Sequence, residues 1–191
     1  MIIYYIAWGS ILWNFKNLKI ETEWTKSKIK FPLNFSRISD NGKGRLTLVI
    51  DKTGEMNNVY YAQTSFSNLN IAIQKLKIRE KTSNKNIGFI NIASNIYRTS
   101  ILDDNKIHEL VNFAKNNKID GLIWTEIPSN FDEVFGKPYS KDNAIEYIES
   151  KYDNKRVYNK ILEYIFLSKI YGNIKTPLSN NLTKKLICNK L

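Results

Sequence analysis

Residues 4–14 read YYIAWGSILWN, and this stretch decides how the first part of the chain folds. An apolar run typical of a buried strand breaks at Gly9-Ser10 and then resumes through Trp13. Glycine and serine favour turns, so a tight turn between two buried elements is one interpretation. The alternative is that the backbone from Gly9 to Leu12 bends so that its N–H groups face a ligand.

Beyond this stretch, the first half of the chain shows the alternation of strands. Strands are predicted over 2–8, 29–35, 45–51 and 59–64, with turns at 40–44 and around Thr53-Gly54. Pro32 indicates an edge or a bulge in the second of these strands. The spacings predict antiparallel hairpins that are able to close into a small barrel.

The second half changes to a helical period, apart from strands predicted over 87–93 and 122–127. Helices are predicted from Ser67 or Asn68 to about Glu80, from Asp103 or Asp104 onward, over 141–151, over 155–171, and after Pro177. The segment 128–139 is predicted as an irregular loop that covers a site.

These elements predict an α+β fold, namely a small, mostly antiparallel β-barrel or a strongly curved sheet with flanking helices. The length of 191 residues favours one domain over 1–191, with 141–191 as a helical C-terminal extension.

The composition is that of a globular domain in a reducing compartment. Hydrophobic residues make up 42% of the chain and charged residues 25%. No apolar run has the length of a membrane helix, and the N-terminus has neither a basic segment nor a cleavage site, so no signal peptide is expected. The one cysteine, Cys188, predicts no internal disulfide and has no partner for a metal site. We therefore expect a cytoplasmic protein without a metal or cofactor.

A formal charge of +11 suggests a nucleic-acid partner, but the kind of cation argues against one. The chain has 24 Lys and only 5 Arg, together with 24 Asn and 27 Ile, an enrichment that AT-rich codons explain. Arginine is the residue favoured for planar recognition of phosphate and guanine. We expect diffuse surface charge, with a binding surface for an anionic polymer as the alternative.

Glu80 is the carboxylate that the pattern explains least well. It follows Leu76 by four residues and Ile73 by seven, so it continues the apolar stripe of its predicted helix. Burying a carboxylate is costly unless the group is paired or used, and burial suits a general base. If the helix frays by residue 79, however, Glu80 is simply solvated.

The other polar residues indicate less. Glu21 and Glu23 are expected on a solvated face, Asp103-Asp104 as a helix cap, and Glu126 at a strand end that is able to face a cleft. His108 lies on the polar side of its helix without a Ser or Cys partner. Neither metal-ligand spacing nor a Gly-rich phosphate loop is present in the sequence.

Several segments together resemble the γ-glutamylcyclotransferase-like proteins. AWGSILW (7–13) is similar to the YGSL signature of that family, and the likeness continues in NFSRIS (34–39) and GRLTLVID (44–51). LKIRE (76–80) is similar to the L-x-x-R-E that carries the catalytic glutamate in the glutathione-degrading ChaC branch. GLIWTEIPSNF and YGNIKTP resemble segments of a bacterial branch.

The resemblance implies cyclisation of a γ-glutamyl amide, which releases 5-oxoproline and an amine. Glu80 would act as general acid and base, and the N–H groups of Ser10, Ile11 and Leu12 would bind the carboxylate or oxyanion at the bend that Gly9 permits. The candidate substrate-binding residues that the resemblance adds are Trp8, which replaces the family tyrosine, Arg37, and Tyr97 as the downstream tyrosine.

Two rival functions remain at the level of sequence. A protein of the same fold is able to hold a γ-glutamyl or other carboxylate ligand without turnover, since a fold does not fix its reaction. A nucleic-acid-associated protein that uses the positive surface is the second rival.

Overall fold

The structure is a computed structural model that describes residues 1–40 and 44–188, the last six of these through their backbone only. The middle of the turn predicted at 40–44 and the side chain of Cys188 lie outside the described residues. In the described part of the chain, no helix has the length and apolar character needed to cross a membrane.

The described strands form one mixed sheet with the order β3-β2-β4-β1-β7-β5-β6. The strands are β1 (Ile3–Ala7), β2 (Thr25–Ser39), β3 (Arg45–Ile50), β4 (Glu55–Thr64), β5 (Ile87–Asn91), β6 (Ile96–Arg98) and β7 (Gly121–Thr125). β1 pairs parallel with β7, whereas β4 pairs antiparallel with β1, and β5 antiparallel with β6 and β7.

The α+β class is confirmed, and of the two sheet forms expected, a barrel or a strongly curved sheet, the closed barrel is wrong. A barrel requires its first and last strands to pair, whereas here β3 and β6 remain as the two edges of the sheet. Alternation in the sequence shows which face of a strand is buried and does not show which strand lies beside it. β6, a strand of three residues after a turn, was not predicted.

The chain divides into two compact units. The first unit consists of Met1–Lys30 and Asn58–Ile127, and the second of Phe31–Asn57 and the described residues from Pro128 onward. β2 and β4 run through both units. The predicted extension over 141–191 is mostly helical where it is described, and it belongs to the second unit together with β3. The expectation of a single domain stays a prediction.

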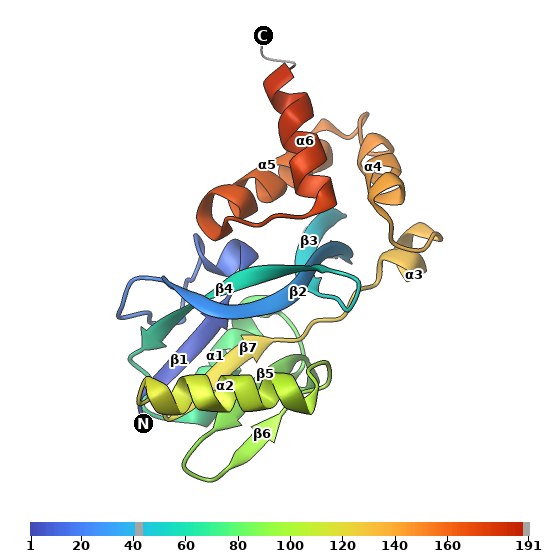
Figure 1. Cartoon of the computed structure of the whole chain (residues 1–191). Helices are drawn as coiled ribbons and strands as arrows, with labels where there is room; N and C mark the ends of the chain where they lie inside the picture. Colours follow the sequence, from blue (N-terminus) through green and yellow to red (C-terminus); the bar gives the residue numbers. More distant parts are fainter. Residues whose placement is uncertain (41–43, 189–191) are drawn as a thin grey trace. The chain divides into compact units, whose positions relative to one another are not determined.

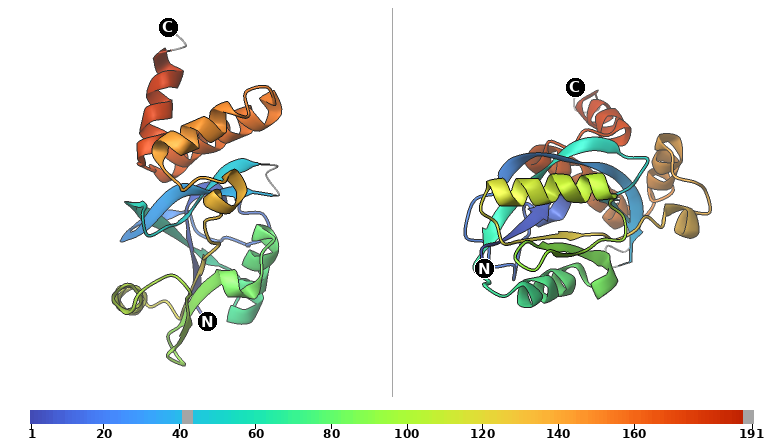
Figure 2. Two further views of the ribbon diagram at one scale, coloured as in Figure 1. Left: turned by 90° about the vertical axis from the view of Figure 1, so that its right-hand side faces the viewer. Right: turned by 60° about the horizontal axis from the view of Figure 1, so that its bottom comes forward.

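In the first unit, helices α1 (Leu69–Glu80) and α2 (Asp104–Asn116) lie on opposite faces of the strands (Figure 1; Figure 2). Successive side chains of β1 point to opposite faces of the sheet, as expected for a strand. The Tyr5 hydroxyl donates to the Ala72 carbonyl of α1 at 2.8 Å. The ring of Tyr4 contacts that of Tyr61 at 5.7 Å in a tilted arrangement, and Tyr61 in turn meets Phe113 of α2 edge to face at 5.0 Å.

The ends of α1 and α2 follow from their capping residues. The Asn68 side chain accepts a hydrogen bond from the N–H of Ile71, and Asp103 accepts one from that of Lys106, so the structure selects Asn68 over Ser67 and Asp103 over Asp104 as the caps. α1 ends at Glu80 because Lys81 adopts a left-handed conformation with φ 52°.

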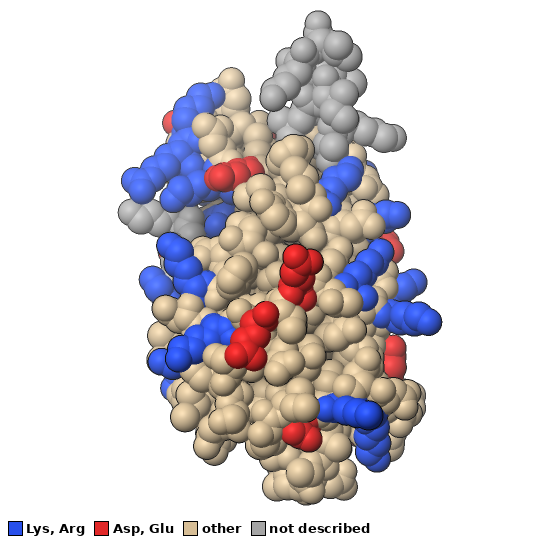
Figure 3. Space-filling model, turned by 90° about the vertical axis from the view of Figure 1, so that its left-hand side faces the viewer, with Lys and Arg blue, Asp and Glu red and all other residues tan. Residues whose placement is uncertain are grey.

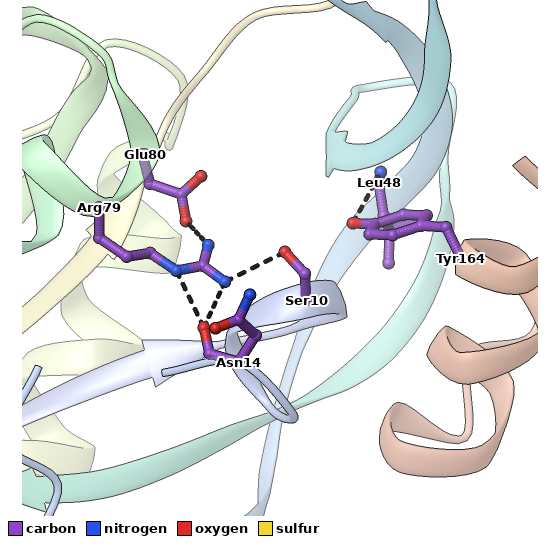
Figure 4. Close-up of polar contacts among 6 residues, drawn as sticks. All are labelled: Ser10, Asn14, Leu48, Arg79, Glu80 and Tyr164. Carbon is purple, nitrogen blue, oxygen red and sulfur yellow. Dashed lines mark hydrogen bonds and ion pairs between the residues drawn. The ribbon is translucent and has the colours of Figure 1, made fainter. Parts of the chain in front are cut away.

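In the second unit, four helices follow β3 and the second half of β2. They are α3 (Phe131–Phe135), α4 (Lys141–Glu149), α5 (Lys155–Gly172) and α6 (Pro177–Cys188). Tyr164 of α5 packs edge to face on Phe35 at 6.2 Å, and its hydroxyl accepts from the N–H of Leu48 at 3.4 Å (Figure 4). The helices over 141–149, 155–172 and after Pro177 agree with the prediction, whereas α3 occupies the segment predicted as a loop.

Candidate functional site

The strand register of the first unit brings four chain segments to one edge of the sheet. This edge is formed by the ends of the strands and not by an outermost strand. β1 and β7 run parallel, so the turn after β1 and the residue after β7, Glu126, lie at the same edge. β5 begins at this edge, because Ile87 pairs with Thr125. α1 follows β4, whose end pairs with Ile3 at the opposite edge, and so its last residue, Glu80, also returns here. Carboxyl ends of parallel strands are a common location for ligand sites.

The turn after β1 is a short 3₁₀ helix, η1 (Gly9–Ile11). Gly9 has φ 56°, the left-handed region in which glycine carries no steric penalty. The Leu12 N–H donates to the Gly9 carbonyl at 3.1 Å, so this N–H is already used within the turn. The side chains of Ile11 and Leu12 are buried in the core. Only the N–H groups of Ser10 and Ile11 therefore remain from the three that the resemblance assigned to a ligand.

Arg79 connects this turn to the end of α1 (Figure 4). Its Nη2 donates to Ser10 Oγ at 3.2 Å and to the Asn14 carbonyl at 2.7 Å, and its Nε donates to the same carbonyl. Its Nη1 forms an ion pair with Oε1 of Glu80. One guanidinium thus holds the predicted turn and the predicted carboxylate together.

Glu80 is sheltered, with 17% of its side chain exposed. It is helical, and Ile73 and Leu76 before it on the stripe are 5% and 0% exposed. The alternative in which the helix frays before Glu80 does not hold. Among the described residues, Arg79 is the hydrogen-bond partner of Glu80 and contacts Oε1, while Oε2 accepts no hydrogen bond from them.

The remaining predicted site residues are placed as follows. Trp8 precedes the turn and is buried, with 5% exposed. Tyr97 lies on β6 with 49% exposed, and no hydrogen bond in the described part of the chain joins it to Glu80 or to the turn. Arg37 belongs to the second unit, where its Nη1 donates to the Pro128 carbonyl at 2.9 Å.

Glu126 is a buried carboxylate with a complete set of hydrogen bonds. It is 1% exposed. Oε1 accepts from Thr99 Oγ1 and from Trp124 Nε1 at 2.7 Å, and Oε2 accepts from the N–H and the hydroxyl of Ser100 at 2.6 and 2.9 Å. A carboxylate with all its acceptor positions filled fixes the chain after β6 rather than reacting with a ligand. The position of Glu126 at the end of a strand suggested that it faces a cleft. The sequence did not indicate that Thr99 and Ser100 are hydrogen-bond partners of Glu126.

The other polar candidates behave as solvated or capping groups. Glu21, Glu23 and His108 are exposed, and Asp103 caps α2. The described side chains contain no group of three or more His, Cys, Asp or Glu that could hold a metal ion.

The segment 128–139, predicted to cover a site, is packed within the second unit. Asn130 accepts from the N–H of Ile38 at 2.8 Å, and Phe131 meets the rings of Phe135 and Tyr139 at 5.4 and 5.2 Å. These contacts give the segment a packing role in its own unit.

Arg79 is the residue that the sequence reasoning missed. It appears there only as a letter of the LKIRE motif, and its direction toward the turn depends on which strand α1 packs against.

Comparisons of the chain with family models, with curated proteins and with solved structures gave no match.

Proposed function

We propose that the chain is an enzyme of the γ-glutamylcyclotransferase type, in which Glu80 moves the proton. The observation that supports this function is the cluster in which Arg79 joins the sheltered Glu80 carboxylate to the Gly9–Ser10 turn at the carboxyl edge of the sheet. The cluster contains a carboxylate that is neither fully solvated nor fully paired. It also contains backbone N–H donors in the nearby turn.

The reaction needs no nucleophile from the protein. The α-amino nitrogen of the substrate attacks its own γ-carbonyl carbon, and the bond between that carbon and the amide nitrogen breaks. The attacking nitrogen loses a proton as the ring of 5-oxoproline forms, and the leaving nitrogen gains one. Oε2 of Glu80 accepts the first proton and returns it to the leaving amine.

The other members of the cluster position the reacting groups. The N–H groups of Ser10 and Ile11 are available as donors, because the first residues of a helix have no partner within it. They would bind the developing oxyanion or the substrate carboxylate. Arg79 keeps Oε1 of Glu80 fixed, so Oε2 alone faces the substrate.

The test is Glu80→Gln, assayed for 5-oxoproline release from a panel of γ-glutamyl amines. Loss of a general acid–base group lowers kcat by roughly a hundredfold to ten-thousandfold. Glu21→Gln is the matched control, because Glu21 is an exposed carboxylate of the same unit. Full activity of Glu80→Gln would remove this residue from the mechanism. Stabilisation by γ-glutamyl ligands without any product would instead identify a ligand-binding protein.

The charge distribution gives little support to the nucleic-acid alternative. On the face shown in Figure 3, Lys and Arg side chains lie mostly toward the two sides of the view, and Asp and Glu side chains lie mostly between them, so this face carries no single continuous cationic stripe. A nucleic-acid protein would show affinity that falls steeply with salt as several counterions are displaced.

A further inference from the structure

We propose that a cavity beside α1 in the first unit binds a small organic anion with an apolar body, such as an acyl or aromatic carboxylate. The proposal does not depend on the proposed cyclotransferase activity. The cavity has a volume of about 470 Å³, and its lining includes Phe15, Lys16 and Lys19 of the loop after the first turn, Phe66 after β4, and Lys75 and Ile78 of α1. Its volume lies within the roughly 300–1,000 Å³ typical of small-molecule sites.

The lining combines apolar surface with positive charge. Phe15 and Ile78 supply exposed apolar surface to the cavity, with 42% and 60% of these residues exposed. Lys16, Lys19 and Lys75 supply three cations, and none of them forms an ion pair with a described residue. Lys19 lies over the Phe66 ring at 5.4 Å, so charge and apolar surface adjoin.

The loop that carries Lys16 and Lys19 is held rigidly. Asn17 and Lys19 adopt left-handed conformations with φ 68° and 46°, which costs conformational energy for residues other than glycine. Between them, Leu18 is fully buried, and its carbonyl accepts from Thr64 Oγ1 at 2.7 Å. The Lys19 carbonyl accepts from the N–H of Ser65 at 3.0 Å. These contacts fix the backbone of the loop from which Lys16 and Lys19 extend beside the cavity.

The two walls of the cavity are tied together by Arg79. Its guanidinium donates to the carbonyl of Asn14, and these two residues are the chain neighbours of Ile78 and Phe15. A preformed cavity loses less conformational entropy on binding than a flexible surface does. The three lysines select for an anion, and Phe15, Phe66 and Ile78 select for an apolar body.

The test is calorimetric titration of the full chain with decanoate, with decanol and decylamine as neutral and cationic compounds of the same chain length. We expect decanoate to bind more tightly than both. The variant Lys16→Gln/Lys19→Gln/Lys75→Gln should weaken decanoate binding by roughly tenfold or more, since each exposed ion pair contributes modestly. The matched control Lys26→Gln/Lys28→Gln/Lys115→Gln removes the same charge from exposed lysines of the same unit that do not line the cavity.

Three results would overturn the proposal. Equal weakening in the two triple variants would mean that net charge alone attracts the anion. Decanol binding as tightly as decanoate would remove the role of the lysines. Binding to vesicles of anionic lipid that depends on the three lining lysines, without binding of soluble decanoate, would identify a membrane contact instead of a small-molecule site.

Discussion

Arg79 donates a hydrogen bond to the hydroxyl of Ser10 across 3.2 Å, although 69 positions separate the two residues in the chain. The contact joins the turn after the first strand to the last turn of α1. Because Arg79 also pairs with Glu80, the position of the candidate catalytic carboxylate depends on this link.

Replacing Arg79 with Met should lower the free energy of unfolding by about 2 kcal/mol, because the partly buried Glu80 and the Asn14 carbonyl lose their charged donor. Lys77→Met is the control, since Lys77 carries the same charge in the same helical turn and makes no side-chain hydrogen bond within the described residues. It should cost about 0.5 kcal/mol or less. Urea denaturation measures both. Equal losses would show that the guanidinium contacts do not contribute to stability.

A double-mutant cycle separates the Arg79–Ser10 contact from the rest. We expect Ser10→Ala to cost about 1 kcal/mol and to cost less in the Arg79→Met background, with a coupling of about 0.5 kcal/mol or more. Fully additive losses would contradict a direct bond between the two side chains.

Glu126→Ala should destabilise the protein by about 3 kcal/mol, since it leaves the buried donors of Thr99, Ser100 and Trp124 without an acceptor. Glu109→Ala removes a carboxylate that is 44% exposed and paired with Lys106, and should cost about 1 kcal/mol or less. Chemical denaturation followed by tryptophan fluorescence compares the two variants. A smaller loss for Glu126→Ala than for Glu109→Ala would refute the structural role of Glu126.

Gly88→Ala should cost about 3 kcal/mol or prevent folding, because its Cβ would lie 2.3 Å from the Trp124 ring and 2.7 Å from Oε1 of Glu126. Gly136→Ala is the contrasting variant. Its Cβ would meet nothing within 4 Å, and with φ +76° it should cost only about 1 kcal/mol from backbone strain. Thermal unfolding of both variants checks the order, and the reverse order would contradict the packing at Gly88.

Stability should fall as the pH rises from about 10 to about 12, because burial raises the pKa of Tyr147 to about 12 from its ordinary value of 10.0. The unfolded chain loses this proton first, so the contribution is complete below pH 10 and is lost as the pH passes through the folded pKa. Burial also raises the pKa of Tyr5, and burial together with the nearby Asp51 charge raises that of Tyr139, so both add to the same trend.

The variant that isolates this effect is Tyr147→Phe. It should reduce the alkaline loss of stability, and at neutral pH it should cost about 1 kcal/mol for the lost hydrogen bond to the Gly44 carbonyl. Tyr152→Phe, at a tyrosine that is 58% exposed, should leave the alkaline slope unchanged. Identical slopes in the two variants, measured by denaturant titration from neutral to alkaline pH, would assign the loss to other groups.

The sequence by itself determined the local elements of this protein. The periods of its apolar residues predicted most of the strands, α1 and its end at Glu80, and the caps Asn68 and Asp103 identified where helices begin. These features depend on residues within a few positions of one another, because backbone hydrogen bonding and side-chain spacing are local. For the same reason, the bend at Gly9 was visible from the letters alone.

The tertiary structure alone decided which of these elements meet. The order of the strands left β3 and β6 as open edges where a barrel was expected, and it brought the C-terminus of α1 to the turn after β1. It also brought Thr99 and Ser100, 27 and 26 positions away in the chain, to the buried Glu126 carboxylate. Contacts of this kind depend on strand partners and packing faces that no nearby residue specifies, so the role of Arg79 became visible only in the folded chain.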